Sequence, residues 1–444
     1  MTTPPIDGLE YLERLTQLGM KFGLDTIRAM TRELGDPQQA YPVLLVAGTN
    51  GKGSVVAYVD AVLRASGLRV GRYTSPHLRC VNERIAVGEP ISDVALEGAL
   101  ARVRDVANRL RESGQIAGHP TYFEALTAAA FDHFSAEKVD VAVVEVGLGG
   151  RLDATNVSQP LASAIVSIAH DHEALLGTSL SAIAKEKAGV LRPGRTTVLG
   201  PVSGDALHTI QETAAELRAR LIPAAHGCSV QERDGGLHIT TPQRRHAGLR
   251  GLPGRHQVDN LLVALRLLEE AEAGGIAVEW SRAGGAISQT TWPGRLQCVA
   301  GSPPLILDGA HNPAAARALA RELRARGSQF VLLFGVMADK DVAGIAAELF
   351  PLARQIVISQ PANERAAAVE DVVARTGATS AETSRDVGMG LRRAQQLASA
   401  SEVVVVAGSL YLVGEVLREL EDQNRATGSL ARNRCAREAP PHGS

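Results

Sequence analysis

The chain has 444 residues, enough for two or three domains with large cores. Its formal net charge of −2 excludes a global positive field that would attract nucleic acid or an anionic membrane. The four cysteines form no C-x-x-C pair, no leader-like segment opens the chain, and no apolar run reaches membrane-spanning length. We therefore expect a cytoplasmic protein without nucleic-acid or membrane partners.

Two short amphipathic helices are expected within residues 8–34, and an apolar strand follows at 43–46. This strand ends in a glycine-rich turn, and a helix-compatible run begins directly after it. Glycines let the backbone approach a phosphate, helix N–H groups face the anion, and Lys52 adds a full charge. The order predicts a phosphate site for ATP; the alternative is an ordinary strand–helix turn. The residues assigned to ATP in this loop are Gly48, Thr49, Asn50, Gly51, Lys52, Gly53 and Ser54.

Further strands and helices are expected to alternate along the first half of the chain, with strands at 68–74, 139–146, 162–168 and 196–199 and helices at 95–112, 121–134 and 180–188. Apart from Asp140 and the carboxylate of Glu145 near its end, the run 139–146 is apolar rather than alternating, which indicates burial on both faces of a parallel sheet. From 228 to 250 short alternating strands predict a small antiparallel insert. We predict an N-terminal parallel-sheet ATPase domain over residues 1–291.

The Pro- and Gly-containing segment 292–295 is predicted to be an interdomain linker. After it, apolar strands at 304–307, 330–335, 355–359 and 402–407 alternate with helical stretches. This alternation predicts a second, Rossmann-like α/β domain over residues 292–422. Residues 423–444 lack periodicity, and we expect them to be disordered.

Three polar residues of the first domain follow predicted strand ends: Ser75, Glu145 and His172. Ligands bind at the carboxyl ends of strands in doubly wound sheets, so we expect these residues to converge on the rim that holds the phosphate loop. A hydroxyl, a carboxylate and an imidazole near a triphosphate predict a magnesium site. The alternatives are a solvated strand-end carboxylate for Glu145 and an ordinary loop histidine for His172.

Lysine is scarce, with six lysines among 46 basic residues. A retained lysine therefore favours a position that needs a compact charge or a titratable amine, which arginine cannot supply. Lys52 fits this interpretation, and Lys187 and Lys340 become candidates. On spacing alone, however, Lys187 is explained by the macrodipole, because it lies in the last turn of its helix.

In the second domain, Asp308 and His311 lie at a strand end where a ribose or phosphate would be recognised. Asn312 and Pro313 are explained structurally, as an N-cap and a first helical residue. Arg295 could reach a phosphate from the linker, or form a linker salt bridge.

A set of motifs recurs in one order along the chain: 48-GTNGKGS-54, 74-TSPHL-78, 145-EVGLGG-150, 186-EKAG-189, His256-Gln257 with Asn260, 292-WPGR-295, 308-DGAHNP-313 and 337-MADKD-341. On these motifs, over about residues 8–420, the sequence resembles the folylpolyglutamate synthase / dihydrofolate synthase family, relatives of the Mur ligases. The resemblance also accounts for a phosphate loop shorter than G-x-x-x-x-G-K-[ST].

The resemblance implies roles for individual residues. Ser75, Glu145 and His172 would hold Mg²⁺, Lys187 would be carbamylated, and Asn260 would contact adenine. Arg295, Asp308 and His311 would contact the nucleotide from the second domain. The catalytic residues implied are Lys52, Lys187 and His172. The substrate residues implied are Phe22, Gly23, Leu24, His77, Phe123, Glu124, Arg151, Asp153 and Ala154.

The chemistry implied is phosphorylation of a pteroate or folate carboxylate by ATP, then attack of L-glutamate on the acyl phosphate. Segments 149–156 and 22–25 are similar to those of members that also make dihydrofolate, which favours a bifunctional enzyme. The family resemblance suggests a monomer. A monofunctional folylpolyglutamate synthase remains an alternative. A Mur-type ligase is disfavoured because only about forty residues precede the phosphate loop, and a non-catalytic ATP switch would not need a second nucleotide-facing domain.

Overall fold

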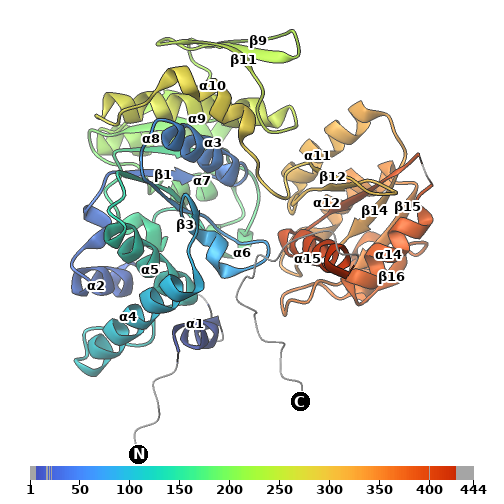
Figure 1. Cartoon of the computed structure of the whole chain (residues 1–444), viewed down its shortest axis with the longest axis horizontal. Coiled ribbons are helices and arrows are strands. Elements are labelled where there is room, and N and C mark those ends of the chain that lie inside the picture. Colours follow the sequence, from blue (N-terminus) through green and yellow to red (C-terminus); the bar gives the residue numbers. More distant parts are fainter. Residues whose placement is uncertain (1–6, 17–18, 20, 22, 400, 427–444) are drawn as a thin grey trace, which may run out of the picture.

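The computed structural model describes residues 7–16, 19, 21, 23–399 and 401–426. Figure 1 shows two α/β bodies joined by the segment that follows α10 (Trp280–Gln289). The first is built on an eight-stranded sheet and the second on a six-stranded sheet. The predicted fold class is confirmed: a parallel-sheet N-terminal domain with an antiparallel insert, followed by a C-terminal α/β domain.

The first sheet has the order β4-β3-β2-β5-β1-β6-β7-β8. The strands that follow β3 in this order all run parallel to one another. β1 and β5 are central and buried at every position, because both are runs of apolar residues apart from Glu145, the last residue of β5. The strands are β1 (Val43–Ala47), β2 (Val70–Tyr73), β3 (Ile85–Val87), β4 (Glu89–Pro90), β5 (Val141–Glu145), β6 (Ala162–Ile165), β7 (Thr196–Leu199) and β8 (Arg220–Pro223).

Helices cover both faces of this sheet, and each face has its own buried apolar cluster. One face is covered by α1 (Gly8–Thr16), α2 (Asp25–Glu33), α4 (Asp93–Glu112), α5 (Tyr122–Ala136), α7 (Leu180–Ala188) and α8 (Gly204–Leu217). The other is covered by α3 (Lys52–Ala65), α9 (His256–Ala273) and α10. The short α6 (Glu173–Leu176) follows β6.

The predicted antiparallel insert is a three-stranded sheet of β9 (Ser229–Arg233), β10 (Gly236–Thr240) and β11 (Arg245–Leu249). Its tight turn places Asp234 and Gly235 at φ 52° and 69°, values that asparagine, aspartate and glycine tolerate best. The insert packs on α10, at the top of Figure 1.

The second sheet has the order β12-β13-β17-β14-β15-β16, and only its edge strand β12 is antiparallel. The strands are β12 (Gln297–Val299), β13 (Leu305–Leu307), β14 (Phe330–Phe334), β15 (Gln355–Ser359), β16 (Glu382–Ser384) and β17 (Val403–Ala407). The helices are α11 (Pro313–Arg326), α12 (Val342–Leu349), α13 (Val369–Thr376), α14 (Val387–Leu397) and α15 (Leu410–Ala426). The expected disorder from 423 onward is wrong for 423–426, which continue α15, and residues 427–444 lie outside the described residues.

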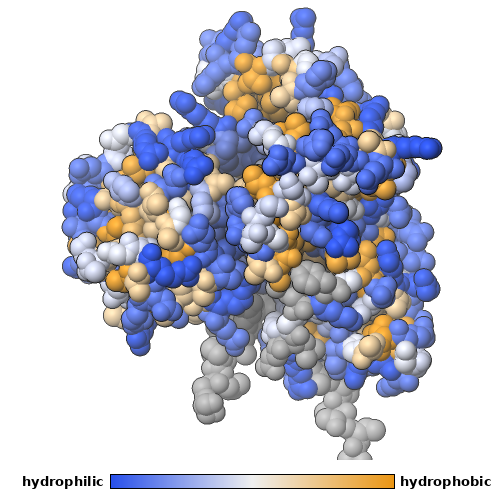
Figure 2. Space-filling view, turned by 180° about the vertical axis from the view of Figure 1, so that it is seen from behind, coloured by the Kyte–Doolittle hydropathy of each residue, from blue (hydrophilic) through white to orange (hydrophobic). Residues whose placement is uncertain are grey.

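The surface offers no broad apolar face among the described residues. Large hydrophobic side chains are exposed there only at Val94, Val230 and Met389. On the face in Figure 2, hydrophilic residues predominate and hydrophobic ones form small separate patches. In the part of the chain that the structure describes, no helix combines the length and apolar character needed to cross a bilayer.

Candidate active site

The predicted phosphate loop connects β1 to the N-terminus of α3, as expected for an anion site. Two of its glycines are required by close contacts. A Cβ on Gly51, whose φ is +84°, would lie 2.3 Å from Oδ1 of Asn260. A Cβ on Gly53 would lie 2.7 Å from Nε1 of Trp292. The loop is therefore packed between α9 and the linker, and the amide of Asn260 lies against the loop itself.

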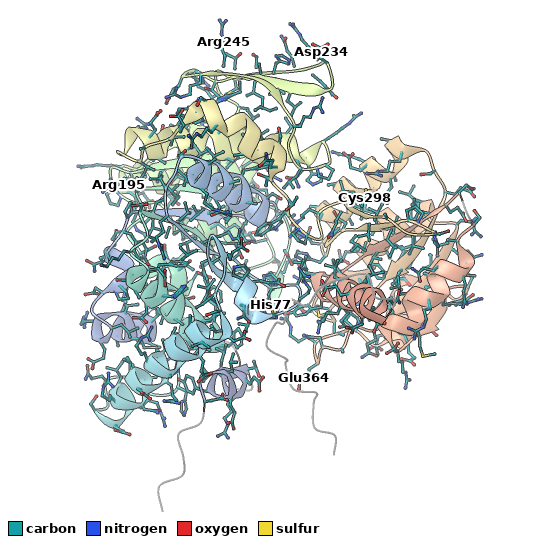
Figure 3. The ribbon with its side chains drawn as sticks, viewed as in Figure 1. His77, Arg195, Asp234, Arg245, Cys298 and Glu364 are labelled. Carbon is teal, nitrogen blue, oxygen red and sulfur yellow. The ribbon has the colours of Figure 1, made fainter. Side chains whose placement is uncertain are left out.

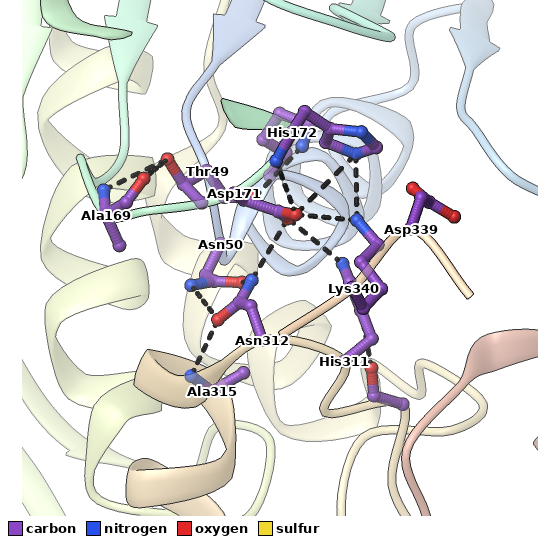
Figure 4. A network of polar contacts seen from close by, with 12 residues as sticks. Thr49, Asn50, Ala169, Asp171, His172, His311, Asn312, Ala315, Asp339 and Lys340 are labelled. Atoms are coloured by element: carbon purple, nitrogen blue, oxygen red, sulfur yellow. Dashed lines mark hydrogen bonds and ion pairs between the residues drawn. The ribbon is translucent and has the colours of Figure 1, made fainter. Parts of the chain in front are cut away.

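Hydrogen bonds to the segment after β6 fix the conformation of this loop. The amide of Thr49 donates to the carbonyl of Ser167 at 2.8 Å, and the amide of Asn50 donates to the Ser167 hydroxyl at 2.9 Å. The Thr49 hydroxyl donates to the carbonyl of Ala169 at 3.2 Å (Figure 4). These hydrogen bonds hold the loop in one conformation, and a loop held in this way has a lower ordering cost on binding an anion.

Lys52, Glu145 and Ser75 meet at the carboxyl end of the first sheet. Lys52 Nζ lies 3.9 Å from Oε1 of Glu145 and donates to the carbonyl of Thr49 at 3.3 Å. The amide of Ser75 donates to Oε2 of Glu145 at 3.2 Å. Burial raises the pKa of Glu145, and the Lys52 charge opposes this. Of the three strand-end residues predicted to converge, Ser75 and Glu145 therefore meet beside Lys52 of the phosphate loop, whereas His172 contacts Lys340 of the second domain instead.

Lys187 points into the protein, toward the phosphate loop. Its Nζ donates to the carbonyl of Gly48 at 3.1 Å, and the residue is only 4% exposed. Burial, reinforced by the Lys52 charge, lowers the pKa of Lys187 to about 7. A side chain buried at the loop is not explained by the helix macrodipole alone, so the position agrees with the titratable amine that lysine scarcity suggested.

Asp171 and His172 lie after β6, where the second domain meets the first (Figure 4). The Asp171 carboxylate accepts hydrogen bonds from Lys340 Nζ at 2.6 Å and from Asn312 Nδ2 at 3.2 Å, and His311 Nε2 lies 3.5 Å away. Lys340 Nζ is also 3.0 Å from His172 Nε2. Since Lys340, Asn312 and His311 all belong to the second domain, the Asp171 carboxylate holds that domain against the phosphate-loop domain.

The charges in this cluster set its protonation. Burial alone would raise the pKa of Asp171, but the hydrogen bond and charge of His311, together with His172 and Lys340, hold the pKa well below its usual range. Burial lowers the pKa of His172 to about 4, and the Lys340 charge adds to this against the pull of Asp171. The imidazole of His172 is therefore neutral near pH 7 and offers Nε2 as an acceptor.

A second contact joins the domains at the phosphate loop. The side-chain amides of Asn50 and Asn312 exchange hydrogen bonds of 3.2 and 2.9 Å. Asn312 also accepts from the amide of Ala315 at 2.9 Å, as the predicted N-cap of α11. Its structural role is thus confirmed, but the same amide reaches the phosphate loop, a contact the sequence did not predict.

The Asp308 carboxylate forms hydrogen bonds with backbone amides. Its carboxylate accepts from the amides of Leu296 and Ala310, both at 2.9 Å. Burial raises the pKa of Asp308, and the nearby Arg295 charge opposes this. Arg295 donates to the carbonyl of Gly294 at 3.1 Å. Asp308 therefore connects Leu296, directly after the linker, to the loop that follows β13.

Several residues predicted to bind substrate have structural roles. Leu24 is buried in the core of the first domain. Glu124 completes the capping box of α5 with Thr121. Asp153 accepts from the amides of Leu148 and Thr155, which closes the loop after β5. These contacts explain the buried carboxylates without any ligand.

The other predicted substrate residues lie as follows. Phe123 packs under the loop after β5, since a Cβ on Gly147 would lie 2.5 Å from its ring. His77 Nδ1 accepts from Arg84 Nε at 2.9 Å. Arg151 pairs with Glu186 at 2.8 Å. Ala154 is buried and Gly23 has φ +141°, whereas Phe22 lies outside the described residues.

Few side chains at this rim are available to hold the magnesium ion that the sequence predicts. Within the described residues, no three or more His, Cys, Asp and Glu side chains are grouped closely enough to hold a metal. Mg²⁺ needs only one or two carboxylates, however, because phosphate oxygens and water complete its shell. Buried Glu145 beside Ser75 fits this requirement. The neutral Nε2 of His172 is a suitable donor atom, but it now faces Lys340.

A phosphate loop on one parallel sheet, facing a second α/β domain across a polar contact, is the arrangement of an ATP-dependent ligase of the Mur type. In agreement, residues 294–410 match the family "Mur ligase, glutamate ligase domain". More narrowly, the chain belongs to the dihydrofolate synthase/folylpolyglutamate synthase family.

Two curated relatives and one solved structure support this assignment. The chain is 32% identical to the dihydrofolate synthase/folylpolyglutamate synthase of Bacillus subtilis (strain 168), over 95% of this chain and 100% of the relative. It is 34% identical to a probable bifunctional folylpolyglutamate synthase/dihydropteroate synthase of Halobacterium salinarum, over 92% of this chain, but spans only 51% of that protein. A crystal structure of a bifunctional folylpolyglutamate synthase/dihydrofolate synthase with Mn, AMPPNP and L-glutamate bound has a TM-score of 0.84 and 33% identity, and the match covers 94% of this chain and 98% of that one.

Asp171 was not predicted as a site residue, although its neighbour His172 was. The sequence signal for this contact was the retained Lys340. Its partner could not be identified from the sequence because the two residues lie 169 positions apart in the chain.

Removing Lys340 should leave the Asp171 carboxylate buried without its cation. We expect Lys340→Met to lower the free energy of unfolding by about 3 kcal/mol, because both side chains are only 7% exposed. Adding Asp171→Asn should restore part of this loss. Urea unfolding of the two single variants and the double variant measures the coupling.

The matched control is Asp339→Asn, one residue away, whose partner Arg365 forms an exposed pair. This control should change stability by less than about 0.5 kcal/mol. An equally small change in Lys340→Met would contradict the buried-pair interpretation.

Proposed function

We propose that the protein is an ATP-dependent amide ligase that adds L-glutamate to dihydropteroate and to folate (poly)glutamates. The observation that carries this proposal is the cluster of Lys52, Glu145 and buried Lys187 at the phosphate loop, facing Lys340 and His311 of the second domain. The names of the relatives, and the AMPPNP and L-glutamate bound in the similar structure, support it.

The reaction would proceed in two steps. The acceptor carboxylate attacks the γ-phosphorus of ATP, giving an acyl phosphate and ADP. The amine of L-glutamate then attacks the acyl carbon, loses a proton, and expels phosphate from a tetrahedral intermediate. Lys52, at the start of α3, would stabilise negative charge on the transferring phosphoryl group. Docking of the two domains would keep water from the acyl phosphate.

The residues proposed for magnesium are Ser75, Glu145 and His172. The bound ion would neutralise charge on the nucleotide phosphates. The Mn in the similar structure supports a divalent cation in that protein. In this chain the Nε2 of His172 could serve only after Lys340 withdraws from it.

We also propose that Lys187 is carbamylated. The neutral amine attacks carbon dioxide, forms an N–C bond and releases one proton, which converts the neutral buried amine into an anionic carbamate. The lowered pKa of about 7 provides the neutral amine near physiological pH. Arginine, which stays protonated, could not react.

The remaining assignments are proposals of the same kind. Asn260, Arg295, Asp308 and His311 would contact the nucleotide, and His77, Phe123 and Arg151 the pterin substrate. The working domain boundaries are 1–291 and 292–422, and we propose a cytoplasmic monomer.

Phosphate release tests this function. We expect ATP-dependent release, with Mg²⁺ and L-glutamate present, when either dihydropteroate or a reduced folate monoglutamate is the acceptor. Product analysis should show one added glutamate on each acceptor. Release with the folate alone would indicate a monofunctional folylpolyglutamate synthase, and release that ignores both acceptors would contradict the ligase.

A further inference from the structure

The loop at residues 74–79 follows β2 and carries two residues assigned to the site, Ser75 and His77. Figure 3 shows His77 between the two domains. Within the first domain the loop is closed by Glu83, whose carboxylate accepts from the amides of Leu78 and Arg79 at 2.8 and 3.1 Å. The loop therefore has a defined shape, but its tip extends toward the second domain.

The tip of this loop is packed by the second domain. The Leu78 side chain lies against the apolar cluster of that domain, which includes Val413 and Val416 of α15. Arg79 forms an ion pair with Glu421, also on α15. Two consecutive residues of the loop thus contact one helix across the domain boundary.

Gly414 of α15 is explained only by this contact. Its backbone is helical and its φ is not positive, so alanine would be the better residue for the helix itself. A Cβ on Gly414, however, would lie 1.9 Å from the carbonyl oxygen of Leu78 and 2.8 Å from its carbonyl carbon. This obstacle is backbone and cannot rotate away, so any side chain at 414 must displace the loop or the helix.

We propose that α15 fixes the conformation of the 74–79 loop, with Leu78 and Gly414 as positioning residues. When the second domain is docked, the loop presents the Ser75 amide to Glu145 and places His77 beside Arg84. When the domain moves away, Leu78 loses its apolar contact and the loop loses its support. Docking of the C-terminal domain therefore completes a part of the site that belongs to the N-terminal domain.

The test uses Gly414→Ala in the full-length chain. In the ligand-free protein, amide hydrogen exchange in peptides covering 74–84 should become about tenfold faster, because the loop opens locally. Exchange in α3 should not change. In the ligase assay, KM for the pterin acceptor should rise about tenfold, and KM for Mg²⁺-bound ATP should rise with it because the loop also carries Ser75, since misplacing a positioned group by about 1 Å costs up to about a hundredfold.

The matched control is Gly285→Ala in α10, where a Cβ would meet no atom within 4 Å. It should leave loop exchange and both KM values at parental levels. Leu78→Ala removes the contact of the Leu78 side chain with the second domain and introduces no clash. It should also make exchange in the loop faster, and it replaces Gly414→Ala as the test if that variant does not fold. Parental loop exchange in the variants that fold would overturn the proposal. The KM prediction rests on the proposed function, whereas the hydrogen-exchange prediction does not. An inactive parent protein would therefore refute the proposed function and leave the exchange test of the loop valid.

Discussion

Lys52→Ala is expected to reduce ATP-dependent ligation by about 10²- to 10³-fold, the usual cost of removing one preorganised group that stabilises transition-state charge. The physical reason is the position of Lys52 at the start of α3, where its ammonium lies 3.9 Å from Glu145. Phosphate release at saturating ATP measures the loss. The fold should survive, because the Lys52 side chain is partly exposed and its one hydrogen bond is a 3.3 Å contact with the Thr49 carbonyl.

The control for this variant is Lys185→Ala, which removes an exposed lysine on α7. It should retain parental turnover, and both variants should keep parental thermal midpoints within a few degrees. Parental turnover in Lys52→Ala would eliminate the proposed phosphate site.

Lys187→Arg should also abolish most of the ligation, by about 10²-fold or more if an anion at this position stabilises the reacting phosphates. With ¹³C-labelled bicarbonate, the parent protein should give a carbamate signal that grows from pH 6 to pH 8. The sign follows from the pKa of about 7: the neutral, reactive amine is the minor form below this pH and the major form above it. A lysine with an ordinary pKa would stay protonated throughout this range.

Lys185→Arg, two residues earlier on the same helix, is the matched control because its side chain is exposed. It should retain both the activity and the ¹³C signal, whereas Lys187→Arg should lose both. A carbamate signal that persists in Lys187→Arg would assign the modification to another amine.

The architecture could be predicted because its strongest signals are local. Continuous apolar runs at 43–47 and 141–145 are long enough to mark buried parallel strands. The edge strands β12 and β16 were not predicted because their three residues include polar side chains, so neither forms an apolar run like that of β13, which has the same length. β8 was missed because its side chains are half-buried or exposed, so its pattern is weak.

The candidate site could be predicted in part. Strand-end position was sufficient for Ser75 and Glu145, since the sheet itself brings them together. It was not sufficient for Asp171, because its role depends on how the second domain docks, and this information is non-local. Glu124 and Asp153 show the opposite limit. Their motif positions suggested substrate contacts, but their carboxylates already accept hydrogen bonds from the backbone amides of Thr121 and Leu148.

The contact between the linker and the phosphate loop has a practical consequence. Trp292 lies against Gly53 and under the guanidinium of Arg72, which is 5.4 Å from its ring. The chain has two tryptophans, and the other, Trp280, hydrogen-bonds to Glu272 near the insert. A Trp280→Phe protein would therefore carry a single indole, that of Trp292, where the linker meets the phosphate loop. Its emission would be an intrinsic optical reporter of domain movement, without any attached label.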